Sequence, residues 1–220
     1  MSINLQSLRL YQEKMAKQVV FNDDFNNPPL KVAGADLSFI DEKGICACVN
    51  LQLPNLKVIE TSTIIKRLTF PYIREYLAFR EAISIMSAYK ELTHQPDMLL
   101  VNAHGIAHPR FFGAASHIGV LLDIATIGVA SHNLCGQYER EPSQIGEAMI
   151  CSYMGRNIGC LFKSKKDCRP LFVSPGHKVS ISSTIQIIKD CMGTHKMPEP
   201  LYLAHIKANQ VKQRELESLL

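Results

Sequence analysis

The sequence contains no apolar run that approaches the roughly 18 residues a helix needs to cross a membrane. Its first residues are polar and amphipathic, unlike those of a secretory leader. These absences exclude an integral membrane protein and predict a soluble, cytoplasmic one. No repeat or low-complexity segment divides the chain, and 220 residues with 46% apolar composition predict a single domain over residues 1–220.

The spacing of a disulfide scaffold is also missing, although the chain has seven cysteines. An odd number without such spacing fits reduced, buried thiols. Cys46 and Cys48 share one face of an expected strand, so they are either core thiols or a thiolate metal pair, and we favour core thiols. Cys135 has no neighbour that would activate it, which argues against an enzyme with a cysteine nucleophile.

A large excess of one charge sign is absent too. The net charge of +4 permits a nucleic-acid partner without demanding one. The most basic run, residues 163–169, fits either a solvated loop or a track for phosphate groups. Charge alone therefore leaves the class of partner open.

The first third of the chain predicts a helix and three strands. Apolar residues recur with helical spacing in residues 8–20. Strands are expected at residues 31–39, 45–51 and 58–66. In the first strand, Asp36 lies on the face opposite Ala33 and Ala35. Because aspartate is disfavoured inside strands, Asp36 is a candidate functional residue.

A second acidic residue lies on an expected helix that begins in the segment after Phe70 and runs through Tyr89. Glu81 shares a face of this helix with Leu77 and Ile85. A carboxylate on an apolar stripe needs a cation or hydrogen-bond donors nearby. Glu81 is thus either a salt-bridged residue at the edge of the stripe or part of a site.

The stretch from Met98 to Cys135 predicts the centre of the fold. Its expected elements are a buried strand, a helix and a second buried strand, at residues 98–101, 111–122 and 125–130. Asn102, His104 and Gly105 directly follow the first strand, where open α/β sheets place their ligands. The pattern predicts an α/β fold with a site at this edge; the alternative is that these polar residues form solvated loops.

The last third predicts further strands and two helices. Strands are expected at residues 146–153, 158–163 and 171–173, and helices at residues 182–192 and from residue 200 onward. Ser182 is the expected N-cap of the first of these helices.

Several motifs stand in one order along the chain. They are Phe70-Pro71-Tyr72-Ile73, Phe79-Arg80-Glu81, Val101-Asn102-Ala103-His104-Gly105, His108-Pro109-Arg110, Gly113 to Gly119, Thr126 to Ser131, and Ser174 to Ser180. Over about residues 8–200, this order resembles the endonuclease V family, whose members cut nucleic acid near hypoxanthine, the deaminated form of adenine. The resemblance implies a ribonuclease H-like fold, in which helices flank a mixed sheet.

The resemblance also implies a catalytic group at the edge of that sheet. Asp36, Glu81 and Asn102 would converge there to bind Mg²⁺, with Mn²⁺ as an alternative, and His108 would orient water or phosphate. The implied partner is DNA or RNA that is single-stranded or contains a deaminated base. The nucleic-acid-binding residues implied in this way are Tyr72, Ile73, Arg74, Ala103, His104, Gly105, Arg110, Ser131, His177 and Lys178.

Some of these residues differ from the family motif and change what recognition we expect. Tyr72 and Ile73 match an apolar wedge that could stack on a base. Ala103 stands where the family has a glycine in the wall of the base pocket, and its methyl group would narrow that pocket. Arg74 could contact a phosphate, whereas Glu75, which also replaces a glycine, would repel one.

Three substitutions affect the expected chemistry more directly. Asn102 and Ser182 each replace an aspartate, which removes negative charge that would hold Mg²⁺. Ser131 replaces a lysine that could meet phosphate charge in the transition state. The sequence therefore supports two readings: a Mg²⁺-dependent nuclease with reduced or altered activity, or a catalytically inactive relative that binds nucleic acid or a protein partner without cutting.

Overall fold

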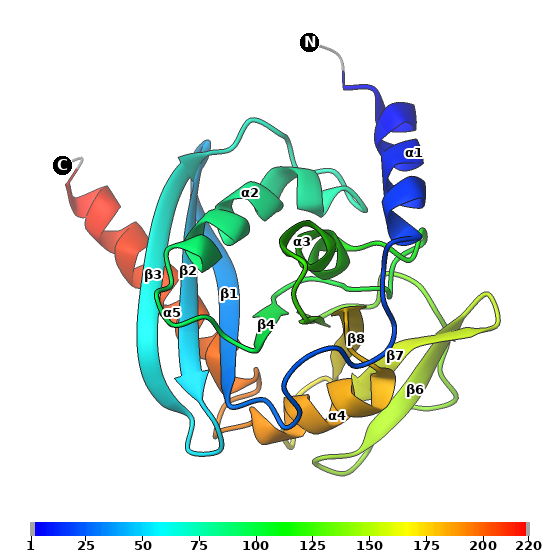
Figure 1. Cartoon of the computed structure of the whole chain (residues 1–220). Coiled ribbons are helices and arrows are strands. Elements are labelled where there is room, and N and C mark those ends of the chain that lie inside the picture. Colours follow the sequence, from blue (N-terminus) through cyan, green and yellow to red (C-terminus); the bar gives the residue numbers. More distant parts are fainter. Residues whose placement is uncertain (1–2, 219–220) are drawn as a thin grey trace.

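An eight-stranded mixed sheet runs through the structure, a computed structural model that describes residues 3–218 (Figure 1). The strands are β1 (Lys31–Ile40), β2 (Lys43–Gln52), β3 (Lys57–Arg67), β4 (Met98–Val101), β5 (Thr126–Ala130), β6 (Ala148–Tyr153), β7 (Arg156–Phe162) and β8 (Leu171–His177). Their order across the sheet is β3-β2-β1-β4-β5-β8-β7-β6. β1, β4 and β5 are parallel neighbours, and the other neighbouring pairs are antiparallel. The predicted α/β fold with a mixed sheet is confirmed.

Helices cover both faces of this sheet. They are α1 (Leu5–Ala16), α2 (Leu77–Lys90), α3 (Ala114–Leu122), α4 (Ile181–Asp190) and α5 (Glu199–Glu217). α2 and α3 pack on one face over a core that includes Ala33 and Leu99, while α4 and the start of α5 pack on the other face over Val32 and Leu100. In Figure 1, α2 lies in front of β1 and β2, and α5 lies behind them.

β1 uses its two faces as its sequence predicts. Ala33 and Ala35 enter the core beneath α2 and α3. Gly34 faces α5 so closely that a Cβ at this position would lie 2.3 Å from the backbone carbonyl carbon of Pro200. Asp36 shares this second face, because residues two apart on a strand point the same way. The missing side chain at Gly34 thus lets α5 approach Asp36.

The register of the parallel strands determines where the site forms. Ala35 of β1 is level with Val101 of β4, which is level with Gly128 of β5. Asp36, Asn102 and the residues after Ala130 consequently meet at one edge of the sheet. The loop after β4 crosses closely over β5, because a Cβ on Gly128 would lie only 2.3 Å from the backbone nitrogen of Gly105.

Several element boundaries differ from the prediction. The segment after Phe70 leads into α2 at Leu77, because Glu75 adopts a left-handed backbone with φ 71° that interrupts a helix before that residue. α3 begins at Ala114 and not at Phe111, whose φ is 53°. The N-cap of α4 is Ser180, whose hydroxyl accepts from the backbone N–H of Ser183, so the prediction of Ser182 as N-cap was wrong. β8 continues to His177, beyond the predicted end at residue 173.

The thiols behave as expected for a reduced protein. All seven cysteines are free, and Cys46 and Cys48 are buried in the core beneath α2. Burial raises the pKa of the Cys48 thiol to about 12, so it is protonated and poorly suited to bind a metal at neutral pH. Within residues 3–218, no helix combines the length and apolarity that a membrane crossing requires. The expected cytoplasmic location stays a prediction.

Candidate functional site

Asp36 lies at the centre of a hydrogen-bonded group at the edge described above. Its side chain is buried, and Nδ2 of Asn102 donates to its Oδ1 at 2.9 Å. Nδ1 of His205 lies 2.7 Å from its other oxygen, Oδ2. Both oxygens of the carboxylate therefore accept hydrogen bonds, one from the loop after β4 and one from α5.

His205 was missed by the sequence reasoning, and it is held by a second pair of polar residues. Nδ2 of Asn209 donates to Nε2 of His205 at 3.0 Å, and the hydroxyl of Ser38 donates to Oδ1 of Asn209 at 2.6 Å. This arrangement requires a proton on Nδ1 of His205 and none on Nε2. The available sequence signal was the spacing of four between His205 and Asn209, which places both on one face of a helix.

Glu81 adds a second carboxyl group close to Asp36. It lies on α2, one turn after Leu77, and is largely buried. Burial, followed by the charge of Asp36, raises its pKa to about 7, although Arg80 acts in the opposite direction. A carboxyl group with this pKa exchanges its proton near neutral pH, and a cation placed beside both acids would favour its ionised form.

The donor set at this edge fits a hard divalent cation, though weakly. Mg²⁺ prefers oxygen ligands, and Asp36 and Glu81 supply two carboxylates, with the amide oxygen of Asn102 as a neutral third. Burial and, after it, repulsion from Asp36 raise the pKa of Glu81, and a bound cation would offset both effects. Among residues 3–218, no three His, Cys, Asp or Glu side chains already surround a common point. Because the amide of Asn102 points its NH₂ group at Asp36, its oxygen would reach such a cation only after the amide turns over.

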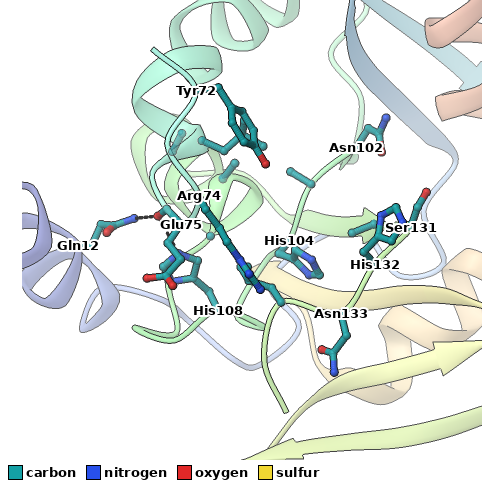
Figure 2. Close-up of a pocket in the computed structure, with 17 residues that line it drawn as sticks. Gln12, Tyr72, Arg74, Glu75, Asn102, His104, His108, Ser131, His132 and Asn133 are labelled. Atoms are coloured by element: carbon teal, nitrogen blue, oxygen red, sulfur yellow. Dashed lines mark hydrogen bonds between the residues drawn. The ribbon is translucent and has the colours of Figure 1, made fainter. Parts of the chain in front are cut away.

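A cavity of about 690 Å³ opens beside this group (Figure 2). It lies between the segment before α2, the loop after β4 and the segment after β5. The predicted site residues that line it are Tyr72, Arg74, Asn102, Ala103, His104, His108 and Ser131. Gln12, Glu75, His132 and Asn133 line it as well, and the prediction did not include them among the site residues. We call this cavity the first pocket.

Burial keeps two histidines of the first pocket neutral, and their ring nitrogens differ in hydrogen-bond partners. Burial lowers the pKa of both His104 and His108 to about 4. Nε2 of His108 lies 2.9 Å from the carbonyl oxygen of Glu75, and its Nδ1 accepts from the backbone N–H of Arg110 at 3.2 Å. Both ring nitrogens of His108 are therefore occupied by backbone groups. Nδ1 of His104 is buried and has no hydrogen-bond partner within the described part of the chain.

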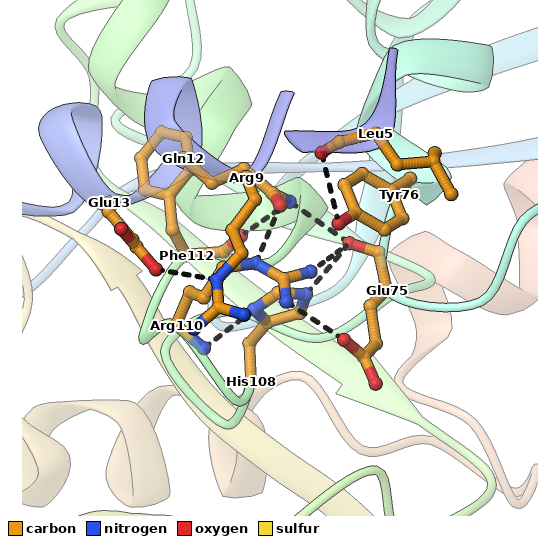
Figure 3. Close-up of polar contacts among 9 residues, drawn as sticks. All are labelled: Leu5, Arg9, Gln12, Glu13, Glu75, Tyr76, His108, Arg110 and Phe112. Atoms are coloured by element: carbon orange, nitrogen blue, oxygen red, sulfur yellow. Dashed lines mark hydrogen bonds and ion pairs between the residues drawn. The ribbon is translucent and has the colours of Figure 1, made fainter. Parts of the chain in front are cut away.

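The guanidinium of Arg110 forms hydrogen bonds with other protein groups (Figure 3). Its Nη1 donates to Oε2 of Glu75 at 2.9 Å, and its Nε donates to Oε1 of Gln12 at 2.7 Å. The guanidinium carbon lies 4.8 Å from the centre of the Tyr76 ring, and the side chain is only 10% exposed. The sequence led us to expect Arg110 on a phosphate, but its guanidinium is already paired with Glu75.

His177, Lys178 and Ser182 lie away from the first pocket. β8 is antiparallel to β5, and His177 pairs with Thr126 at the start of β5, whereas Ser131 follows its end. Nζ of Lys178 lies 3.0 Å from carboxylate oxygens of both Asp24 and Asp123. Ser182 lines a different cavity. Ile73 and Gly105 are also absent from the lining, and Gly105 is a buried residue of the loop after β4, packed against Gly128 of β5.

Comparison with known proteins finds one family that the chain matches in sequence and in fold. The family model described as endonuclease V matches residues 13–206. The endonuclease V of Streptomyces avermitilis is 27% identical with a TM-score of 0.89, over 98% of this chain and 96% of that one. The catalytic domain of human endonuclease V is 26% identical with a TM-score of 0.89, over 99% of each chain. A Ciona intestinalis endonuclease V, in complex with a 24mer DNA that contains an inosine, shares the fold at 24% identity and a TM-score of 0.81, over 98% and 99% of the two chains.

Proposed function

The chain belongs to the endonuclease V family, and from this premise we propose that it binds DNA or RNA containing hypoxanthine and hydrolyses a nearby phosphodiester with the help of Mg²⁺. The observation that carries the proposal is the pair of largely buried carboxyl groups, Asp36 and Glu81, beside the first pocket. Buried acids without a use would only cost stability. Family relatives are seen with inosine-containing DNA, which supports nucleic acid as the partner.

The first pocket has the features needed to hold an extruded base. Tyr72 is 72% exposed at its rim and offers an aromatic face for stacking. Nδ1 of His104 is a buried polar atom in need of a partner, which the edge of a base can supply. Ala103 narrows the wall by one methyl group relative to a glycine. These features favour a base that leaves its stack at low cost, such as a deaminated one.

Around Asp36 and Glu81, which we call the carboxylate edge, different residues would hold a metal and the reacting phosphate. Asp36 and Glu81 would provide charge to Mg²⁺, and Asn102 a neutral oxygen. The bound ion would activate water and stabilise the leaving oxygen. Arg74 is the cation in the pocket lining, since Arg110 is paired with Glu75 and Ser131 carries no charge. We therefore expect weaker metal binding and slower hydrolysis than an aspartate at residue 102 and a lysine at residue 131 would give.

A second function, binding without cutting, is favoured by one observation. The amide of Asn102 points an N–H group, and not an oxygen, at Asp36. Turning the amide over would break this hydrogen bond, a cost that opposes metal binding. In this case the first pocket would hold nucleic acid, while Asn102 stayed hydrogen-bonded to Asp36 and no phosphodiester was cut.

Strand cutting by matched variants decides between these functions. Single-stranded DNA and RNA oligonucleotides, each with one inosine, are incubated with Mg²⁺ or Mn²⁺. The proteins compared are the unaltered chain, Asp36→Ala, Asn102→Asp/Ser131→Lys, and Asn55→Asp as a charge control in the exposed turn between β2 and β3. Cutting by the unaltered chain that Asp36→Ala abolishes supports hydrolysis.

The other outcomes are equally informative. Cutting only by Asn102→Asp/Ser131→Lys supports binding as the natural function, because the fold and pocket would then be intact. If none of the proteins cuts or binds the inosine oligonucleotides, the proposal fails. Asn55→Asp should behave like the unaltered chain throughout, since residue 55 lines neither the first pocket nor the carboxyl ends of the parallel strands.

A further inference from the structure

A second cavity, of about 360 Å³, lies on the other side of the loop that follows β4. It is lined by Phe21, Ile106, Phe111, Arg156, Asn157, Pro175, Val179, Ile181 and Ser182. Ile106 and Phe111 belong to the same loop that sends His104 and His108 into the first pocket. The two cavities therefore share this loop as a wall. We call the new cavity the second pocket.

Two aromatic rings provide flat apolar surface in the second pocket. Phe21, between α1 and β1, is 43% exposed. Phe111 is partly exposed, and the ring of Tyr153 lies 5.8 Å behind it. The backbone of Phe111 has φ 53°, a conformation that is rare for a bulky residue and is found mostly where function or packing demands it. A planar ligand could stack on these rings.

The charge of the lining favours an anion. Arg156 is the cation among the lining residues, and none of those within the described chain is a carboxylate. Its guanidinium carbon lies 5.5 Å from the centre of the Phe111 ring. Asn157 accepts a hydrogen bond from Ser152 through Oδ1, which leaves its NH₂ group able to donate. The second pocket thus offers aromatic rings to a planar ligand, Arg156 to an anion and the NH₂ group of Asn157 to a hydrogen-bond acceptor.

We propose that the second pocket binds a nucleobase with its attached phosphate, the base against Phe21 and Phe111 and the phosphate on Arg156. Base–aromatic stacking and an arginine beside it are the means by which proteins hold single-stranded nucleic acid. This chemistry has two sources: a neighbouring nucleotide of the strand in the first pocket, or a free mononucleotide. The strand form rests on the proposed function, whereas the mononucleotide form does not.

The test measures binding in EDTA, so that no cutting intervenes. Fluorescence anisotropy follows three ligands: a short inosine oligonucleotide that spans only the first pocket, longer ones extended in each direction, and labelled adenosine monophosphate. The variants are Phe21→Ala and Arg156→Ala. The control is Arg67→Ala, which removes the same charge from the far side of the sheet, on β3, where Arg67 is 76% exposed. Thermal unfolding of each variant checks the fold.

The strand form predicts that Phe21→Ala and Arg156→Ala each weaken the longer oligonucleotides about tenfold. The short one should bind Phe21→Ala like the unaltered chain and should lose no more affinity for Arg156→Ala than for Arg67→Ala. The mononucleotide form predicts that adenosine monophosphate binds and that Arg156→Ala weakens it by about the same factor. Arg67→Ala should weaken every oligonucleotide slightly and equally.

Two outcomes would overturn the proposal. One is that both variants bind every ligand like the unaltered chain. The other is an equal loss for all ligands, the short oligonucleotide included, with a lower melting temperature, since the pocket would then serve only the fold. If no oligonucleotide binds the unaltered chain, the proposed function fails, and adenosine monophosphate alone decides the second pocket.

Discussion

The side-chain amide of Asn102 donates to Oδ1 of Asp36 across 2.9 Å, so an N–H group stands where a metal would need an oxygen. An aspartate at residue 102 would reverse this relationship. It would add a negative charge beside Asp36 and Glu81 and remove the hydrogen bond. The charge balance of the edge, and with it the affinity for a divalent cation, therefore depends on this one side chain.

We predict that Asn102→Asp lowers the free energy of unfolding in the absence of metal. We also predict that added metal stabilises this variant more than it stabilises the unaltered chain. Without metal, repulsion and the lost hydrogen bond should reduce the free energy of unfolding by about 1–3 kcal/mol. A cation that binds the folded state at a hundredfold excess over its Kd returns about 2.7 kcal/mol. Melting temperatures across a Mn²⁺ and Mg²⁺ titration measure both effects. An equal metal-induced rise in Asn102→Asp and in its Asp36→Ala derivative would contradict the prediction.

We predict that His117 makes the protein sensitive to acid. His117 packs among the rings of Tyr11, Phe79 and Phe112, and burial lowers its pKa to about 4. In the unfolded chain, His117 binds a proton near its ordinary pKa of about 6.5. Full stability is therefore present above that pH, and part of the free energy of unfolding is lost as the pH falls toward about 4.

His117→Phe should remove this acid-dependent loss. Between about pH 7.5 and about pH 5, the unaltered chain should lose about 2 kcal/mol more of its free energy of unfolding than the variant does. Urea unfolding at the two pH values measures the difference. Equal losses in the two proteins would show that the pKa of His117 is ordinary. The variant also removes Nδ1 of His117, which has no partner within residues 3–218, so stability at neutral pH should not fall.

We predict that Glu75 restrains binding of nucleic acid by occupying Arg110. Glu75→Gly removes the carboxylate that pairs with Arg110 and suits the left-handed backbone at φ 71°. The freed guanidinium should strengthen oligonucleotide binding and raise the slope of log Kd against log salt by about one. Anisotropy titrations over a salt series measure this change. The double variant Glu75→Gly/Arg110→Ala should lose the gain; a gain that persists would point to another cause.

We predict that Asn209 determines the tautomer of His205. Asn209→Ala removes the donor to Nε2, so the proton of the ring is no longer restricted to Nδ1. Nitrogen NMR of the imidazole should show one tautomer in the unaltered chain and a mixture in the variant. Stability should fall by about 1 kcal/mol. An unchanged tautomer in the variant would mean that Asp36 alone orients the ring.

The local pattern of the chain predicted the strands for a simple reason. Alternation in β1 depends on a period of two, so the separation of Ala33 and Ala35 from Asp36 follows once a strand forms. Asn102 meets Asp36 because the carboxyl ends of parallel strands share an edge. The start of α3 at Ala114 was missed, since the left-handed backbone of Phe111 before it is set by contacts with other segments.

By itself, the sequence predicted most of the elements and the α/β class, and its resemblance to the endonuclease V family implied that Asp36, Glu81 and Asn102 converge. Tertiary structure alone decided the partners of these groups. His205 reaches Asp36 across 169 residues of chain, and Arg110 reaches Glu75 across 35, distances at which no periodicity carries information. The antiparallel direction of β8 sends Lys178 to the opposite end of the sheet from Ser131. Strand direction results from packing of the whole sheet, and no local motif encodes it.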